Sequence, residues 1–167
     1  MNRPSSLQRE RLRCIEMVRI ARLYLDTCAL VRLFDQRNQV RVRAEAHAIE
    51  DFFSFVFQGS VRWVISEVLE AEIAGNPDEG MRSEALQLLA ASKERVVLSE
   101  DAFQRAGDLE NLGYGAFDAL HLACAEQAQV DGLLTTDDRF IRLVRRGLGN
   151  PGIRVENPLD WRRGFTP

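Results

Sequence analysis

Several features that point to particular classes of protein are scarce or missing in this 167-residue sequence. Its three cysteines, Cys14, Cys28 and Cys124, lie far apart and form no CxxC pair, so a zinc or disulfide framework is excluded and free thiols in a reducing cytoplasm are expected. No apolar run approaches the roughly 20 residues of a membrane-spanning helix. The N-terminal residues also lack the apolar core of an export signal. We therefore expect a cytoplasmic protein that does not enter membranes.

Lysine is nearly absent, and positive charge is carried unevenly by arginine. Residues 64–138 contain 16 acidic and four basic residues, whereas residues 139–163 contain seven arginines and two acids. An acidic middle beside basic ends suits a pocket that holds a cation next to a rim that attracts phosphate. For any single arginine, a solvated surface in an arginine-preferring genome explains the same pattern.

Short apolar runs alternate with amphipathic stretches along the chain, which predicts a single α/β domain. The predicted strands are 21–26, 61–65, 95–98, 132–135 and 153–155, and helices are predicted between them. This order favours a three-layer α/β/α fold around a mostly parallel sheet of four to five strands. The domain is expected over 21–161, with 1–20 as an extension, helical or disordered, and 162–167 as a tail.

The most informative single residue is Asp26, because the apolar run Leu23-Tyr24-Leu25 leads directly into it. An acid at this place lies at the carboxyl end of a strand, where open α/β sheets bind their ligands. A buried charge needs a partner, and a metal cation is one candidate. We hypothesise that Asp26 is the first ligand of a divalent-metal nuclease site.

Two further acids stand at comparable places. Asp137 follows the apolar run of the fourth predicted strand, and Asp118 opens a predicted helix. Because the carboxyl ends of parallel strands share one edge of a sheet, both acids are able to converge with Asp26. Like charges at such spacing are unfavourable unless protons or cations neutralise them. Taken singly, Asp118 or Asp137 is explained equally well as a capping or first-turn residue of a helix.

A fourth acid has to be chosen among three glutamates on one predicted helix. Residues three and four apart share a helix face. Glu72 follows Leu69 by three and Val68 by four, which places it on the apolar side, whereas Glu67 and Glu70 lie on the opposite, wet side. Glu72 is therefore the candidate. A partly exposed helix residue without a function is its plain alternative.

The segments that contain these acids resemble the PIN-domain family, best known for the nuclease toxin of bacterial VapBC toxin–antitoxin pairs. They are Leu23-Tyr24-Leu25-Asp26-Thr27, Ile65-Ser66 to Ala71-Glu72-Ile73, Asp118-Ala119-Leu120-His121-Leu122-Ala123, Leu134-Thr135-Thr136-Asp137 and Glu156-Asn157-Pro158. Each segment is short, but their order and spacing span about 21–161, which is nearly the whole chain.

The resemblance implies a PIN-like fold in which Asp26, Glu72, Asp118 and Asp137 are catalytic and hold Mg²⁺ or Mn²⁺. Hard cations of this kind take oxygen ligands, and they orient and acidify water for attack on phosphate. The implied activity is that of a ribonuclease that hydrolyses RNA phosphodiester bonds, as the toxin of a toxin–antitoxin pair or as a solitary protein. An antitoxin and a second copy of the chain are the implied protein partners.

Several neighbours of the acids have two interpretations each. Thr27 and Thr135 could hold carboxylates by hydrogen bonds, or they could serve as a helix cap and a strand former. His121 could reach the face of Asp118, but a packed histidine is favoured because hard-metal sites rarely use imidazole. Cys28 stands where the family often has Asn or Ser, and a thiol is a poorer hydrogen-bond partner for orienting the adjacent carboxylate.

Other functions are compatible with parts of this pattern. The main alternative is a catalytically impaired PIN-fold regulator that binds RNA or a protein. A haloacid-type phosphatase requires a second Asp two residues after the first, where this chain has Cys28. A phosphoryl-transfer receiver needs a lysine, a role that only Lys93 could fill, and the chain has no Gly-rich phosphate loop that ends in lysine.

Overall fold

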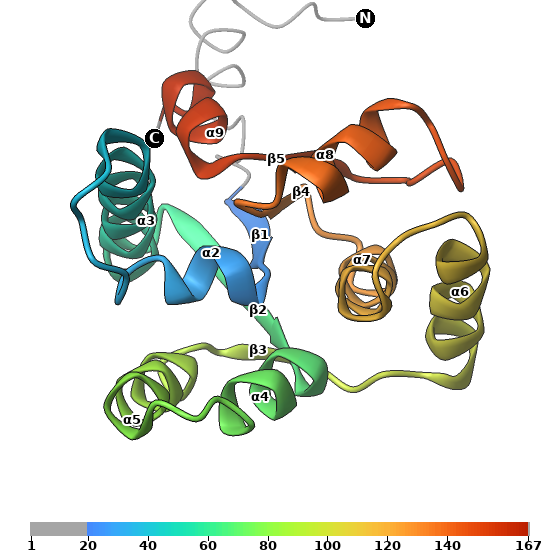
Figure 1. The fold of residues 1–167 in the computed structure, drawn as a ribbon, viewed down its shortest axis with the longest axis horizontal. Helices are drawn as coiled ribbons and strands as arrows, with labels where there is room; N and C mark the ends of the chain where they lie inside the picture. The colour runs from blue at the N-terminus through green and yellow to red at the C-terminus, as the bar shows by residue number, and fades with distance from the viewer. Residues whose placement is uncertain (1–19, 167) are drawn as a thin grey trace, which may run out of the picture.

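The computed structural model describes residues 20–166, in which five parallel strands form one sheet covered by helices on both faces (Figure 1). The strands are β1 (Ala21–Leu25), β2 (Val61–Ser66), β3 (Glu94–Val96), β4 (Gly132–Leu134) and β5 (Arg154–Glu156). The helices are α2 (Thr27–Val31), α3 (Val40–Gln58), α4 (Glu67–Ala74), α5 (Glu79–Leu89), α6 (Glu100–Asn111), α7 (Ala116–Gln127), α8 (Asp138–Arg145) and α9 (Pro158–Gly164). The expected three-layer α/β/α architecture is confirmed.

The strand order β3-β2-β1-β4-β5 places β1 at the centre of the sheet. Tyr24 pairs with Val64 on one side and with Leu133 on the other. All neighbours are parallel, so every strand ends at the same edge, and the loops that follow β1, β2 and β4 meet there. In an open α/β sheet this carboxyl edge is where a ligand site forms.

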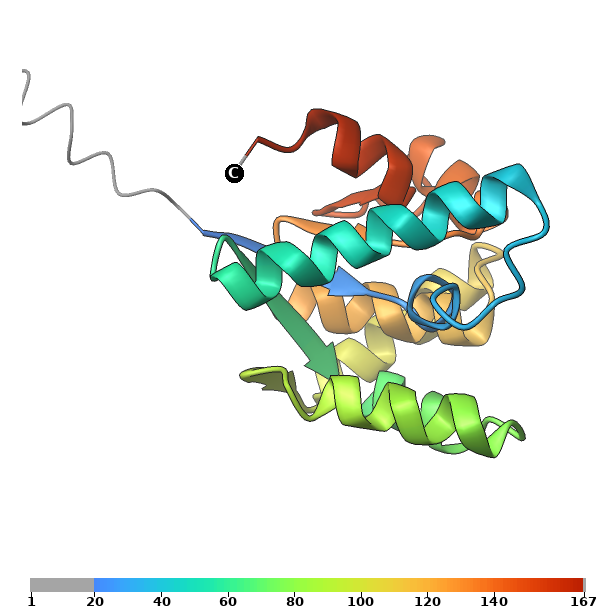
Figure 2. The same cartoon turned by 90° about the vertical axis from the view of Figure 1, so that its left-hand side faces the viewer.

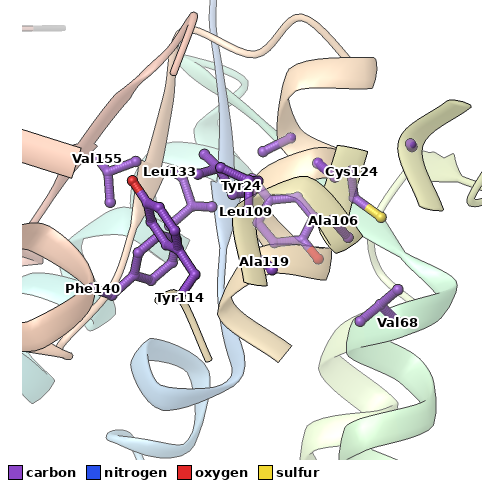
Figure 3. Close-up of a cluster of buried hydrophobic side chains, with 14 of the residues drawn as sticks. Tyr24, Val68, Ala106, Leu109, Tyr114, Ala119, Cys124, Leu133, Phe140 and Val155 are labelled. Atoms are coloured by element: carbon purple, nitrogen blue, oxygen red, sulfur yellow. The ribbon is translucent and has the colours of Figure 1, made fainter. Parts of the chain in front are cut away.

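Alternate residues of the strands enter two separate cores. Tyr24 packs with residues of α6, α7 and α8 in one cluster, part of which is shown in Figure 3. Leu23 and Leu25 belong to the other cluster, which is built mainly with α2, α3, α4, α5 and α9. Figure 2 shows α3 crossing β1 on this second face, with α5 below it. Each fully buried leucine contributes roughly 1.5–3 kcal/mol, so the two clusters fix the strands in register.

The ends of the elements follow the capping rules, with one difference from expectation. Ser66 and Ser99 each accept a hydrogen bond from an amide of the next turn, as predicted, and Gly59 ends α3 in the left-handed region at φ 78°. The cap of α2, however, is Asp26 and not Thr27. β1 ends at Leu25, so Asp26, with extended backbone angles, is the N-cap of α2. The Thr27 hydroxyl does not cap the helix but donates to Glu72.

The C-terminal end of the chain differs most from the sequence prediction. Helix α9 continues across position 161, where the domain was expected to end, and Arg162 donates to Asp51 of α3 over 2.7 Å. Phe165 packs on Phe55 and Trp161. The segment after 161 is therefore attached to the domain. The predicted extension over 1–20 lies outside the described residues, apart from Ile20. Within residues 20–166, no helix has the length and apolarity needed to cross a membrane.

Candidate active site

Four acids from four different elements occupy the carboxyl edge of the sheet. Asp26 follows β1 directly, and Asp137 follows β4 after two threonines. Asp118 lies in the first turn of α7, and Glu72 lies on α4, the helix that starts where β2 ends. The parallel topology therefore brings the elements that carry these four acids to one edge, although the acids are separated by up to 111 positions in the chain.

Asp26 is the most deeply buried of the four, with 1% of its surface exposed. Its Oδ1 accepts a hydrogen bond of 2.8 Å from the amide of Ala29, and its carboxylate also binds the hydroxyl of Thr135. Burial raises the pKa of Asp26 to about 6, against the opposing effects of His121 and of these hydrogen bonds. A charged carboxylate at this position is thus held at an energetic cost to the metal-free fold.

Asp137 is joined to Asp26 through Thr135. The Thr135 hydroxyl oxygen accepts from the amide of Asp137 over 3.0 Å, while it binds the carboxylate of Asp26. Oδ1 of Asp137 caps α8 and accepts from the amides of Arg139 (2.6 Å) and Phe140 (3.1 Å). The capping interpretation is therefore correct for this residue. Its other oxygen takes no hydrogen bond from the described residues, so capping occupies only half of the carboxylate.

Asp118 lies against a glycine that gives it room. Burial, and next the charge of Asp137, raises the pKa of Asp118 above its ordinary value. Its Oδ2 lies 2.9 Å from where a Cβ of residue 115 would stand, so any residue other than Gly115 would displace the carboxylate. Gly115 has φ −67°, which every residue tolerates. Close approach, and not backbone freedom, is what requires glycine here.

Glu72 is the only one of the three candidate glutamates that points to this edge. Glu67 accepts from the amide of Leu98, and Glu70 pairs with Arg95 over 2.7 Å, so both lie toward β3. Oε2 of Glu72 instead accepts from the Thr27 hydroxyl and from Nε2 of His121 at 2.8 Å. Burial raises the pKa of Glu72, but these two hydrogen bonds outweigh it and leave the pKa below its usual value.

The pKa of the Cys28 thiol is affected by all four acids. Cys28 has exposed surface, yet burial followed by the charges of Asp26, Asp137, Asp118 and Glu72 raises the pKa of its thiol to about 12. All four carboxylates therefore act on one short region. Beside it lies an open hollow of about 260 Å³, lined by Cys28, Val31, Arg32, Asp35, Thr136 and Asp137.

The negative charges at this edge have few cationic neighbours. Among the described residues, no arginine or lysine forms an ion pair with Asp26, Asp118 or Asp137, and Glu72 is paired only with His121. In residues 20–166, no three His, Cys, Asp or Glu side chains are grouped as the ligands of one metal ion. The donor set itself is all carboxylate oxygen, which is the chemistry that Mg²⁺ and Mn²⁺ prefer.

Sequence reasoning did not identify two members of the site and only half-described a third. His121 is packed, as favoured, with 2% exposed surface, but it also binds Glu72. Tyr24 and Ser66 extend this contact further into the core. Tyr24 stands between leucines in a buried strand and Ser66 caps a helix, so each has an ordinary local explanation. A polar hydroxyl in an otherwise apolar strand was the available signal.

Comparison with known proteins gives a family for this arrangement. No curated protein matches the sequence at a significant level. The crystal structure of VapBC2 from Rickettsia felis bound to a DNA fragment from their promoter is similar, with a TM-score of 0.53, 16% identity, and coverage of 81% of this chain and 98% of that chain. FitAcB from Neisseria gonorrhoeae has a TM-score of 0.48 at 16% identity and covers 81% of this chain and 97% of its own.

At 16% identity the likeness to VapBC2 shows a shared fold and nothing finer. The family model is more specific, because the PIN domain matches residues 23–145, a range that includes all four acids at the carboxyl edge. The match covers well over half of the chain. This chain belongs to the PIN domain family.

Proposed function

We propose that this protein is a divalent-metal-dependent endoribonuclease that hydrolyses RNA phosphodiester bonds, with Asp26, Glu72, Asp118 and Asp137 as its catalytic and metal-binding residues. One observation carries the proposal: four acids stand on elements that meet at the carboxyl edge of the sheet, and three of them form no ion pair within residues 20–166. Like charges held together in this way are expected where a cation binds. Membership in the PIN domain family supports the same conclusion.

The residues fit Mg²⁺ or Mn²⁺ by the chemistry of their oxygen donors. When bound, such an ion supplies an acidified water for in-line attack and offsets charge on the phosphate oxygens. The protein prepares the carboxylates for this role. Thr135 ties Asp26 to the backbone of Asp137, Gly115 leaves room for Asp118, and Thr27 holds Glu72. These contacts limit the movements that the carboxylates must make to share a cation.

An RNA substrate is supported by the charges around the acids. Helix α8 starts directly after Asp137, and its residues Arg142 and Arg145 and its C-cap Arg146 are exposed. Arg139 donates to the carbonyl of Gly113 over 2.7 Å, which holds its guanidinium near Gly115 and Asp118. Guanidinium groups on a helix that begins at the carboxyl edge suit the phosphates of a polyanion. We propose that α8 guides the RNA backbone to the acids.

The protein context is proposed from the family. VapBC2 is one of the similar structures, and an antitoxin partner, a homodimer and a cytoplasmic location follow for this chain if it acts as the toxin of such a pair. The alternative is a catalytically impaired regulator of the same fold that binds RNA or a protein. It is favoured by the absence of three grouped ligands within residues 20–166 and by Cys28 beside the first acid.

The test is cleavage of structured and unstructured RNA during a Mn²⁺ titration, comparing the wild type with Asp118→Asn. We expect the wild type to cleave only with Mn²⁺ and the variant to lose at least about 100-fold in rate, because second-sphere changes alone cost 10–100-fold. Asp101→Asn is the matched control, since Asp101 occupies the first turn of α6 as Asp118 occupies that of α7. Asp101→Asn also removes one negative charge from the first turn of a helix, but it leaves the four acids unchanged.

The outcomes separate the two functions. Equal cleavage by Asp118→Asn and Asp101→Asn contradicts the assigned site. No cleavage by the wild type at any Mn²⁺ concentration, with RNA binding retained in both variants, supports the impaired regulator instead.

A further inference from the structure

A continuous chain of hydrogen-bonded side chains runs from the core to Glu72. Ser66 Oγ lies 2.6 Å from the Tyr24 hydroxyl, which lies 2.7 Å from Nδ1 of His121. Nε2 of His121 lies 2.8 Å from Oε2 of Glu72, and the Thr27 hydroxyl binds the same oxygen. The members come from β2, β1, α7, α4 and α2, so only the assembled fold creates the chain.

The inner members of this chain are buried. Tyr24 and Ser66 have no exposed surface and His121 has 2%, whereas the Glu72 side chain is 27% exposed. Figure 3 shows Tyr24 among apolar side chains such as Leu133, Leu109 and Ala119. Buried polar groups require partners, which accounts for the contacts among Tyr24, Ser66 and His121. That requirement does not explain why the chain leads outward to one oxygen of the partly exposed Glu72.

With a neutral His121, the Glu72 carboxylate, which only accepts, leaves one assignment of donors and acceptors along the chain. Ser66 Oγ already accepts from the amide of Leu69 at 3.2 Å, so its hydroxyl is free to donate to the oxygen of Tyr24. The Tyr24 hydroxyl then donates to Nδ1 of His121. This leaves the imidazole proton on Nε2, where it donates to the Glu72 carboxylate. Each member fixes the direction of the next.

We infer that His121 is a positioning residue for Glu72: the Ser66–Tyr24 pair fixes the His121 tautomer, and His121 with Thr27 anchors Oε2 so that Oε1 is left for the cation. Oε1 takes no hydrogen bond from the described residues, in contrast to the two donors on Oε2. The inference rests on the proposed function, because it gives the anchored carboxylate a purpose. Outer hydrogen bonds of this kind set the orientation of metal-binding side chains.

A matched pair of substitutions tests whether His121 orients Glu72 or only provides a hydrogen-bond partner for the buried Tyr24 hydroxyl. His121→Gln places its amide nitrogen near Nε2, so it keeps a donor for Glu72 and loses the partner of Tyr24. His121→Asn places its amide near Nδ1, so it keeps a partner for Tyr24 and loses the donor to Glu72. Mn²⁺ affinity is measured by calorimetry, beside cleavage and thermal unfolding. We expect affinity within about threefold of the wild type for Gln and a loss of 10–100-fold for Asn.

Two further measurements keep the test decisive if His121→Asn does not fold. Thr27→Val removes the other donor to Oε2 and is expected to weaken Mn²⁺ binding in the same direction. The ¹⁵N shifts of His121 in the metal-free wild type are expected to show a protonated Nε2 and an unprotonated Nδ1. Equal Mn²⁺ affinity in Asn and Gln variants, or a proton on Nδ1 alone, overturns the inference. A wild type that binds no Mn²⁺ contradicts the proposed function itself.

Discussion

The two edges of the sheet treat charge in opposite ways. At the amino edge, Glu94 accepts from Arg22 over 2.7 Å and pairs with Arg62 over 3.0 Å, so its charge is balanced by two guanidinium groups. At the carboxyl edge, Asp26 and Asp118 have only hydrogen-bond donors and other acids near them, apart from the longer-range effects of His121 and Arg139. A hollow of about 300 Å³ at the amino edge, with Arg62 and Lys93 in its lining, contains no acid.

The difference distinguishes ion pairs that stabilise the fold from acids that are available to bind a cation. The Arg22–Glu94–Arg62 group ties β1, β2 and β3 together and pairs its one carboxylate within the fold. At the other edge, burial first and the neighbouring acids second raise the pKa values of Asp26, Asp118 and Cys28, a combination that is common at functional sites. Substitutions at the two edges should therefore have opposite consequences for stability and activity.

The largest effect is expected at Asp26. Asp26→Asn keeps an N-cap oxygen for Ala29 but removes the buried charge, so RNA cleavage should fall at least about 100-fold. In metal-free buffer at pH 8, the free energy of unfolding should rise by about 1–3 kcal/mol, since two pKa units correspond to roughly 3 kcal/mol. Chemical denaturation with a chelator present measures this. Asp78→Asn, at the exposed cap of α5, is the control and should change stability by less than about 0.5 kcal/mol.

The same substitution also predicts a change in pH dependence. The unfolded chain releases the Asp26 proton near pH 3.8, whereas the folded chain holds it up to about pH 6. Between these values the native state binds more protons, so wild-type stability should fall as pH rises and then level off. Asp26→Asn lacks this proton and should lose that part of the slope. An equal decline in the variant would show that Asp26 is not the group responsible.

A smaller effect of the opposite kind is expected at the amino edge. Glu94→Ala leaves Arg22 and Arg62 without their carboxylate, and both are partly exposed, so we expect a loss of about 1–2 kcal/mol in stability. Cleavage by the folded variant should equal that of the wild type, as measured at saturating Mn²⁺. Lost cleavage at unchanged stability would mean that the two edges are coupled.

The smallest effect on cleavage is expected from substituting a glycine, and two glycines are compared. Gly115→Ala brings a Cβ to 2.9 Å from Oδ2 of Asp118, so cleavage should fall about five- to tenfold while the fold persists. Gly107→Ala, inside α6 and with nothing within 4 Å of its Cβ, should leave cleavage unchanged and raise stability by about 0.5–1 kcal/mol. Rate and thermal unfolding are measured for both. Similar rates in the two variants would show that Asp118 tolerates displacement.

Local patterns were sufficient for much of the fold. Short apolar runs predicted β1 and β2, and Ser66, Ser99 and Gly59 marked the helix ends where the structure has them. Helix α9 was not predicted, because Pro158–Gly164 is short and its apolar residues pack on α3, which no local period reveals. Thr27 was predicted as the N-cap of α2, but the cap is Asp26. Local propensity does not distinguish two neighbouring residues as a helix start.

The sequence by itself determined that an acid ends the first strand, that two more acids stand at comparable places, and that Glu72 is the glutamate on the apolar side of its helix. These follow from periodicity and parallel topology, which are local or nearly local properties. Only the tertiary structure decided which donors each carboxylate meets. Tyr24, Ser66 and His121 are far apart in the chain, and their hydrogen bonds depend on how β1, β2 and α7 pack. Asp26 was recognisable from the sequence; the anchoring of Glu72 was not.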